Sequence, residues 1–236
     1  MGLMPTTLTL QRDRVRLLLQ EPTAQHWSNA VLNLYINEAQ FSIATGCVPG
    51  IGTGMTEPLL ASEAYAASVD DQELYSMPTN YHGARTVRAR SVSTEDFSEL
   101  PIVDIEYVRA HPRTKAAKPT HYFLWGESGT YQLGMYPAFN SANGRIYVSY
   151  WRLPSELTGD SSALQVPPEL LIATSYLAAY RAQLERGHFS DAETLFKNFT
   201  AEYQGALSYI NQRQINQDRA VILGNLGYDD TDRILP

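Results

Sequence analysis

The chain has 236 residues, 44% of them hydrophobic, and a formal net charge of −7. The length predicts one elaborated domain or two small ones. The acidic balance argues against a protein that grips nucleic-acid phosphates, since such proteins carry a basic surplus or stripe. We expect neither a membrane helix nor a secretory signal, because no run approaches about 20 apolar residues and charges interrupt the apolar part of the N-terminus.

Two helices are predicted in the first part of the chain. The first covers residues 9–20 and ends at Glu21-Pro22, since proline cannot continue a helix. The second begins after Ser28, which can cap its start, and ends near Gly46. Its apolar residues recur at helical spacing and predict one buried face, made of Leu32, Tyr35, Ile36, Ala39 and Ile43.

A glycine-containing segment follows, in which glycines occupy positions 50, 52 and 54. These glycines fit neither the G-x-x-x-x-G-K-[ST] loop nor a strand–G-x-G-x-x-G–helix unit. We therefore expect a flexible loop here and no phosphate site. Cys47 is the single cysteine, so it cannot form an internal disulfide, and we expect a small buried residue at this position.

Residues 73–153 are strand-like and predict an antiparallel sheet of about five or six strands. The strand segments are ELYSMP, ARTVRARSV, IVDIEYV, HYFLWG, TYQLGMY and RIYVSYWRLP. The last two are joined by AFNSANG, in which Asn143-Gly144 favours the positive φ angles of a tight hairpin. Alternation along the last strand predicts one face with Ile146, Val148 and Tyr150, and an opposite face with Tyr147, Ser149 and Trp151.

The helical pattern returns after a polar segment, residues 155–162. Pro167-Pro168 suits a first helical turn, and Gly187 suits the position just after the end of that helix. Ser190 and Glu193 are spaced as a capping box for a last helix, and the short link between the two helices predicts an antiparallel hairpin. After Asn211 the apolar residues lose their periodicity, which indicates an extended tail that docks on something else.

This order of elements predicts an α+β fold. The helices of residues 1–48 cannot cover their apolar faces alone, so they form a four-helix bundle with those of residues 163–211. The central antiparallel β-insertion covers residues 72–154, and the extended C-terminal tail covers 212–236. Residues 155–162, which we call the polar crossing, lead from the insertion to the bundle. We expect them near an inter-subunit surface.

No group of residues predicts catalysis, a metal or a cofactor. Ser128 in WGESGT lacks the helix that must follow a nucleophile elbow, so this stretch predicts a hairpin turn. The five histidines form no H-x-x-x-H pair, although His111 and His121 could meet across the base of one loop. Asp104 and Glu106 alternate onto one face of a predicted strand and are more consistent with a solvated surface than with acid–base work.

Basic and aromatic residues indicate contact surfaces. The modestly basic segment 109–121 is expected to be a solvated loop, with contact to nucleic acid or an acidic partner as the lesser alternative. Fifteen tyrosines and three tryptophans exceed what a core needs, and such side chains are enriched at protein interfaces. We predict subunit contacts at Trp125, Tyr147 and Trp151. Such side chains also form sugar platforms, so the alternative is a carbohydrate- or receptor-binding module.

Four stretches resemble the head–tail adaptor proteins of tailed phages, also called connectors or head completion proteins. They are WSNAVLNLYINEAQFSIAT, LYSMPTNY, GMYPAFNSANGRIYVSYWRLPSEL and PPELLIATSYLAAYRAQLERGHFSDAETLFKNFTAEYQGAL. Their order, across about residues 30–210, matches the family. Asn29 stands where the family often has Asp, and Met77 where it has Leu.

The resemblance implies a structural virion protein, made in the host cytoplasm and located in the neck at the head–tail interface. It implies a homo-oligomeric ring, usually of twelve copies, between the portal protein and a tail, nozzle or terminator protein. DNA passes through the lumen without sequence-specific binding, and the protein has no cofactor and no membrane. The C-terminal segment reaches toward the portal, so the candidate portal or neighbour contacts are Ile222, Leu223, Leu226, Tyr228, Ile234 and Leu235.

Overall fold

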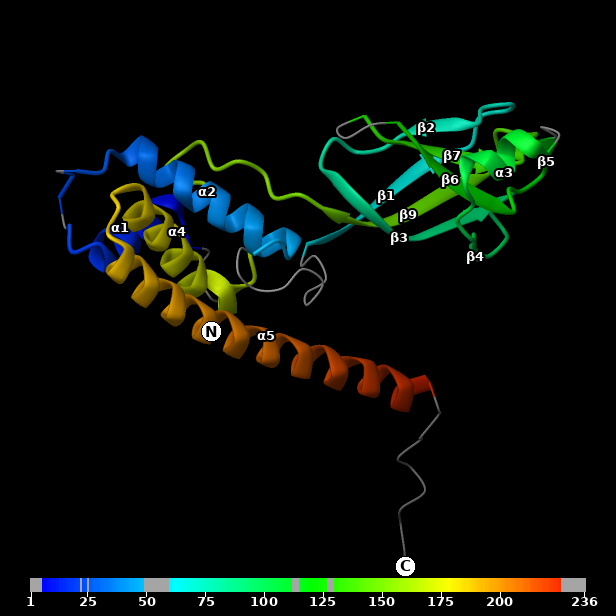
Figure 1. Cartoon of the computed structure of the whole chain (residues 1–236). Coiled ribbons are helices and arrows are strands. Elements are labelled where there is room, and N and C mark those ends of the chain that lie inside the picture. Colours follow the sequence, from blue (N-terminus) through cyan, green and yellow to red (C-terminus); the bar gives the residue numbers. More distant parts are fainter. Residues whose placement is uncertain are drawn as a thin grey trace, which may run out of the picture. The chain divides into compact units, whose positions relative to one another are not determined.

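The computed structural model describes residues 6–21, 23–24, 26–48, 60–111, 115–126 and 130–225, with side chains described up to residue 212. Helices and antiparallel strands make it an α+β protein, as predicted. The chain divides into two compact units, of which unit 1 is Met1–Gln40 with Leu157–Pro236 and unit 2 is Phe41–Glu156. Helices from both ends of the chain therefore belong to the same unit (Figure 1).

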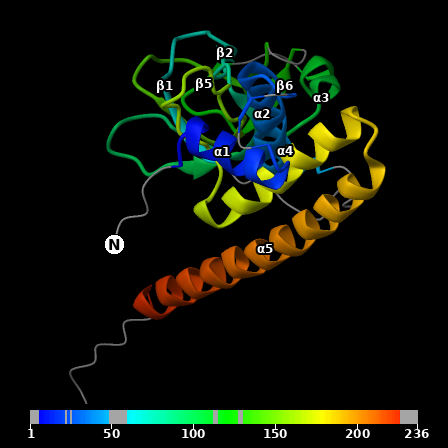
Figure 2. The ribbon, with the colours of Figure 1, turned by 90° about the vertical axis from the view of Figure 1, so that its left-hand side faces the viewer.

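Unit 1 is helical. Its elements are α1 (Leu8–Leu18), α2 (Asn29–Thr45, whose last turn belongs to unit 2), the 3-10 turn η1 (Pro168–Leu170), α4 (Leu171–Glu185) and α5 (Phe189–Asn225). Helices α4 and α5 lie side by side as a hairpin, as predicted, and α1 packs against α4 (Figure 2).

Local capping sets the helix ends. Ser28 caps α2 as predicted, since its Oγ accepts a hydrogen bond from the Val31 N–H at 3.3 Å. Gly187 follows α4 with φ +75°, the left-handed conformation that glycine adopts without a Cβ penalty. The predicted capping box is wrong, because α5 begins at Phe189 and places Ser190 inside the first turn.

Helix α5 is longer than the sequence pattern predicted. It continues to Asn225, so the prediction of an extended tail is wrong for residues 212–225. The segment lacks a clean apolar stripe, but it contains three Gln and two Arg, which favour helix, and no proline, so the helix that precedes it can continue.

The core of unit 1 follows the predicted periodicity. All five residues of the predicted α2 face are buried. Helix α5 contributes an aromatic stack in which the ring centroids of Phe199 and Tyr203 lie 5.4 Å apart. Four of the eight buried positions of α4 are alanine, which lets neighbouring helices approach closely; they are Ala173, Ala178, Ala179 and Ala182.

The described part of unit 2 contains three small sheets instead of the single one predicted. The antiparallel four-stranded sheet has the order β1 (Ala61–Ala67), β9 (Arg145–Arg152), β3 (Tyr81–Arg90), β4 (Ser98–Glu99). The antiparallel three-stranded sheet has the order β2 (Leu74–Ser76), β7 (Gln132–Tyr136), β6 (His121–Trp125). A parallel pair joins β5 (Lys115–Ala116) to β8 (Ala138–Phe139).

The predicted hairpin between β7 and β9 is wrong. Strand β7 pairs with β2 and β6, whereas β9 pairs with β1 and β3, so the connection carries the chain from one sheet to another. Gly144 does not have a positive φ. A Cβ there would lie 2.7 Å from the Arg90 carbonyl oxygen, so this glycine permits a close approach of backbones. Strands β6 and β7, which flank the stretch WGESGT, pair antiparallel; residues 127–129 of that stretch lie outside the described residues.

Two further elements differ from the prediction. Strand β1 was missed, because its alternation relies on alanines in ASEAYAA, a weak strand signal. The strand-like segment IVDIEYV contains instead a short helix, α3 (Ile105–Ala110). Asp104 caps it by accepting a hydrogen bond from the Glu106 N–H at 3.0 Å, which is why these two carboxylates do not share a strand face.

The two larger sheets of unit 2 share one core. The predicted inward face of β9 is confirmed, since Ile146, Val148 and Tyr150 are all buried. They belong to one apolar cluster with Leu133 and Met135 from β7. The outward face of β6 is covered separately, where Phe123 packs with Val108 of α3. In the four-stranded sheet, the strand positions that alternate with these core residues therefore lie on its outer face.

Candidate interaction surfaces

The described part of the chain offers no group of His, Cys, Asp and Glu side chains suited to a metal ion. In the same part, no helix is long and apolar enough to cross a membrane. Cys47 is exposed, so the prediction of a buried cysteine is wrong; it follows the end of α2 at Thr45 and therefore lies outside the helix's buried face. The features that could serve a function are an exposed aromatic surface on unit 2 and buried polar clusters in unit 1.

The outer face of the four-stranded sheet carries aromatic and arginine side chains. Cross-strand register places Tyr147 of β9 between Tyr65 of β1 and Arg88 of β3. The ring centroids of Tyr65 and Tyr147 lie 5.0 Å apart, and the Arg88 Cζ lies 5.9 Å from the Tyr147 ring centroid. Residues that share this side of paired strands contact one another directly.

A second cation lies over the neighbouring tryptophan. The Arg85 Cζ is 4.5 Å from the ring centroid of Trp151, within the range of a cation–π interaction. An open depression lies between these side chains. We call this surface the arginine–aromatic face and define it by Glu63, Tyr65, Arg85, Arg88, Tyr147 and Trp151.

Glu63 is the carboxylate of the arginine–aromatic face. Its Oε1 accepts a hydrogen bond from the Tyr147 hydroxyl at 2.7 Å, and its Oε2 accepts one from the Tyr65 hydroxyl at 3.4 Å. The bond to Glu63 raises the pKa of Tyr147, because a phenol that donates to a carboxylate resists losing its proton. The face therefore holds both signs of charge around two phenols.

Of the three predicted subunit contacts, the structure brings two together. Tyr147 and Trp151 share the arginine–aromatic face, whereas Trp125 lies at the end of β6 in the other sheet. Trp125 is 41% exposed and has its own cation, with the Arg109 Cζ 5.7 Å from its ring centroid. Arg109 is also paired with Glu106 at 2.6 Å, so this cation has an anion within the chain.

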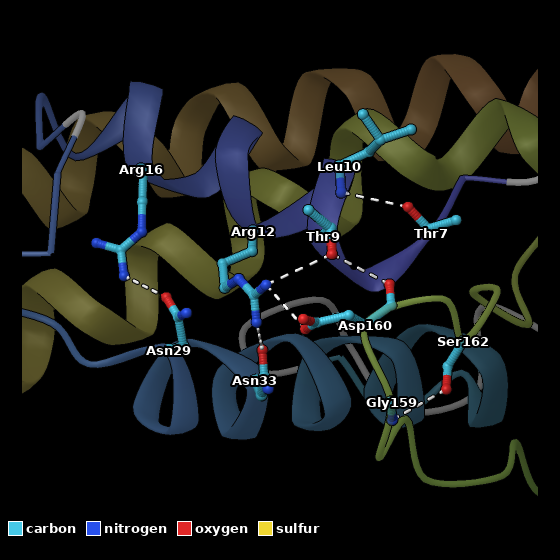
Figure 3. Close-up of polar contacts among 10 residues, drawn as sticks. All are labelled: Thr7, Thr9, Leu10, Arg12, Arg16, Asn29, Asn33, Gly159, Asp160 and Ser162. Carbon is cyan, nitrogen blue, oxygen red and sulfur yellow. Dashed lines mark hydrogen bonds and ion pairs between the residues drawn. The ribbon is translucent and has the colours of Figure 1, made fainter.

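Buried arginines fasten the start of unit 1 in a way the sequence did not predict (Figure 3). Arg12 of α1 is 6% exposed, and its Nη2 lies 2.9 Å from the Asp160 carboxylate. Its Nη1 donates to the Asn33 side-chain oxygen of α2 at 3.2 Å. One guanidinium thus joins α1, α2 and the polar crossing. The available signal was that Arg12 shares the helix face of Leu8 and Val15, which are buried.

A second arginine, Arg16, holds the turn between α1 and α2. It donates to the Trp27 carbonyl at 2.9 Å and to the Asn29 side-chain oxygen at 2.8 Å. Its Nη1 lies 3.6 Å from Glu21, and both side chains are 7% exposed. Asn29, one of the departures from the family pattern, is therefore a hydrogen-bond acceptor for a cation whose negative partner is Glu21.

The polar crossing is fixed along both helices. Asn37 of α2 accepts from the Leu157 N–H at 2.8 Å and donates to the Leu157 carbonyl at 3.2 Å. The Gln165 N–H donates to the Gln40 side chain at 2.7 Å. On the α1 side, the Leu8 N–H donates to the Ser162 carbonyl at 2.9 Å. These bonds give partners to backbone N–H and C=O groups that, in a loop, have none from a helix or a sheet.

The six candidate portal contacts all lie in the last 15 residues of the sequence. Ile222 and Leu223 belong to helix α5, although their side chains are outside the described part of the structure. Leu226, Tyr228, Ile234 and Leu235 lie outside the described residues, as does the glycine segment 49–55.

Residues 5–223 match the family described as SU10 adaptor protein. The chain belongs to the SU10 adaptor family. A chain in the solved structure "Neck of empty GTA particle computed with C6 symmetry" is similar at 15% identity and a TM-score of 0.29, covering 76% of this chain and 82% of that one. The comparison with curated proteins gave no match. Membership confirms the predicted resemblance to phage head–tail adaptors, a family of structural proteins and not of enzymes.

Proposed function

We propose that this protein is the head–tail adaptor of a tailed phage, a structural virion protein that forms a ring in the neck. The family match over residues 5–223 is the observation that carries this proposal. The ring holds twelve copies and joins the portal protein to the tail, nozzle or terminator protein. The protein has no catalytic role and no cofactor.

The ring encloses the path of the DNA. A net charge of −7 supports this role, because an acidic wall repels phosphates and lets the duplex slide without sequence-specific binding. Host cytoplasmic synthesis precedes assembly into the virion. Helix α5 and the residues after it contact the portal through Ile222, Leu223, Leu226, Tyr228, Ile234 and Leu235.

The helices of unit 1 form a four-helix bundle in this proposal and supply part of the contact between copies. Several large apolar side chains remain exposed on them, including Leu17 of α1 at 76% and Phe189 of α5 at 71%. Contact with a neighbouring copy would bury such side chains and stabilise the ring. Unit 2 is the β-insertion and contributes Trp125, Tyr147 and Trp151.

The alternative, a carbohydrate- or receptor-binding module of a phage tail or baseplate, has less support. A sugar platform needs a free aromatic face, and Arg85 lies over the indole of Trp151. A sugar would have to displace that guanidinium before it could stack.

Oligomeric mass tests the proposal. The purified chain, alone and mixed with portal rings, is measured by mass photometry and imaged in negative stain. We expect a closed ring of defined copy number that binds the portal, and a phage lacking the chain should accumulate DNA-packaged heads without tails. A chain that remains monomeric alone, with the portal and within particles would rule the proposal out.

The C-terminal contact has a separate test. Ile222→Asp combined with Leu223→Asp should reduce portal binding at least about tenfold, because burying a carboxylate at an apolar interface is costly. Ser208→Asp combined with Asn211→Asp, at exposed positions of the same helix, is the matched control. Equal portal binding by both double variants would assign the portal contact elsewhere.

A further inference from the structure

Two guanidinium groups on the outer face of the four-stranded sheet have aromatic partners but no anion. Arg85 lies over Trp151 and Arg88 over Tyr147, and both arginines are exposed. Neither forms a hydrogen bond or an ion pair with any residue that the structure describes. A guanidinium over an aromatic ring keeps its N–H donors, whose fork geometry matches a carboxylate or phosphate.

The other residues of the face favour a protein partner over a phosphate backbone. Glu63 lies within the same depression, so the face presents both signs of charge; a protein surface can match both signs, whereas a phosphate backbone offers only anions. Arginine, tyrosine and tryptophan are also the residues that dominate binding energy at protein interfaces.

The chain itself carries the complementary groups. Several exposed carboxylates form no ion pair within the described part of the chain, among them Asp13, Asp96, Glu156, Glu185 and Glu202. A cyclic ring pairs one surface of a copy with a different surface of its neighbour. The cations of one copy and the free carboxylates of the next can therefore meet without any change within a copy.

We infer that Arg85 and Arg88 bind exposed carboxylates of the neighbouring copy of this chain, with Tyr147 and Trp151 packing around the pairs. The inference rests on the proposed ring and names the chemistry of one of its contacts. The aromatic rings hold each guanidinium in place before binding, so less side-chain freedom is lost when the carboxylate arrives.

Charge reversal tests the inference. Arg85→Glu combined with Arg88→Glu should raise the concentration needed for half-assembly at least about tenfold, since close interfacial charge pairs contribute that much or more. Arg14→Glu combined with Arg186→Glu makes the same change in net charge at two exposed arginines of unit 1. Unchanged assembly of the first variant, or an equal loss in the second, would overturn the inference.

A milder variant guards against misfolding. Arg85→Gln combined with Arg88→Gln removes both charges without adding repulsion, and should weaken assembly while the melting temperature stays within about 2 °C of wild type. High salt should weaken wild-type assembly in the same direction, because salt screens exposed charges. Wild-type assembly that is insensitive to salt contradicts a contact made by charge pairs.

Cross-linking identifies the partner carboxylate. Rings of Arg85→Lys/Arg88→Lys chains, mixed from unlabelled and ¹⁵N-labelled copies, are treated with a carbodiimide, which joins an amine to a touching carboxylate as an amide with loss of water. Mixed-isotope peptides that link position 85 or 88 to an Asp or Glu support the inference. Links found only within one copy, for example to Glu63, refute it.

The outcomes separate this inference from the proposed function. A wild-type chain that never assembles removes the proposed function and this contact together. A wild-type ring that tolerates charge reversal removes the contact alone. A charge-reversed ring that assembles normally but loses affinity for duplex DNA would assign the face to phosphates instead.

Discussion

Arg12 and Asp160 lie 148 positions apart in the sequence and 2.9 Å apart in the structure. The arginine side chain is 8% exposed and the aspartate side chain 74% exposed, so the burial of this pair is one-sided. The pair fastens the polar crossing, which follows the β-insertion, to the first helix of the chain. This asymmetry has a measurable consequence.

Asp160→Ala should destabilise the protein more than Arg12→Met does. The alanine leaves a buried guanidinium without its anion, which costs about 2 kcal/mol or more, whereas the methionine leaves an aspartate that water solvates. Urea unfolding followed by circular dichroism measures both. The double variant should resemble Arg12→Met alone, and equal effects of the two single variants would show that the guanidinium does not depend on Asp160.

Glu21→Gln should lower the free energy of unfolding by about 3 kcal/mol, because it removes the charge opposite the buried Arg16. Glu38→Gln is the matched control: Glu38 pairs with Arg181 but its side chain is 45% exposed, so its loss should cost at most about 1 kcal/mol. Chemical denaturation compares the two. Similar losses would mean that Glu21 contributes no more than a surface pair.

Gly134→Ala should destabilise unit 2 by about 1–3 kcal/mol. A Cβ at this position would lie 2.1 Å from the Phe123 ring, which pairs with Gly134 across the sheet and is buried. Gly205→Ala is the opposite case, because nothing lies within 4 Å of its Cβ position in helix α5, and it should stabilise by about 1 kcal/mol. Thermal unfolding distinguishes the signs, and a stabilising Gly134→Ala would show that the Phe123 ring moves freely.

Stability should fall in alkali. Burial raises the pKa of Tyr81 from 10.0 to about 12, and burial also raises the pKa of Tyr75 and Tyr122. A raised folded-state pKa contributes stability that is complete below pH 10 and is lost as pH rises toward 12, at about 1.4 kcal/mol per unit for each group. Tyr81→Phe should flatten this fall in urea unfolding between pH 9 and 12. An unchanged slope would show that Tyr81 ionises equally well in the folded protein.

Local periodicity was enough to predict several elements of this protein. The buried face of α2 and the inward face of β9 follow from spacing alone, since a helix repeats every 3.6 residues and a strand every two. Gly187 was recognisable as the residue after α4 for a similar reason. The left-handed φ that ends a helix depends on that residue alone and favours glycine. The family resemblance also lies in the sequence, in the order of four motifs.

Tertiary structure decided which segments pair. Strand β9 could have paired with β7, its neighbour along the chain, yet it pairs with β1 and β3, because side-chain alternation records which face is buried and not which strand lies alongside. The partners of buried charges were likewise decided by the tertiary structure. Arg12 was visible in the sequence, but its anion arrives 148 residues later, and only the return of the chain brings the two together. Periodicity is a local property of the backbone, whereas strand partners and buried ion pairs depend on contacts between segments that the sequence keeps far apart.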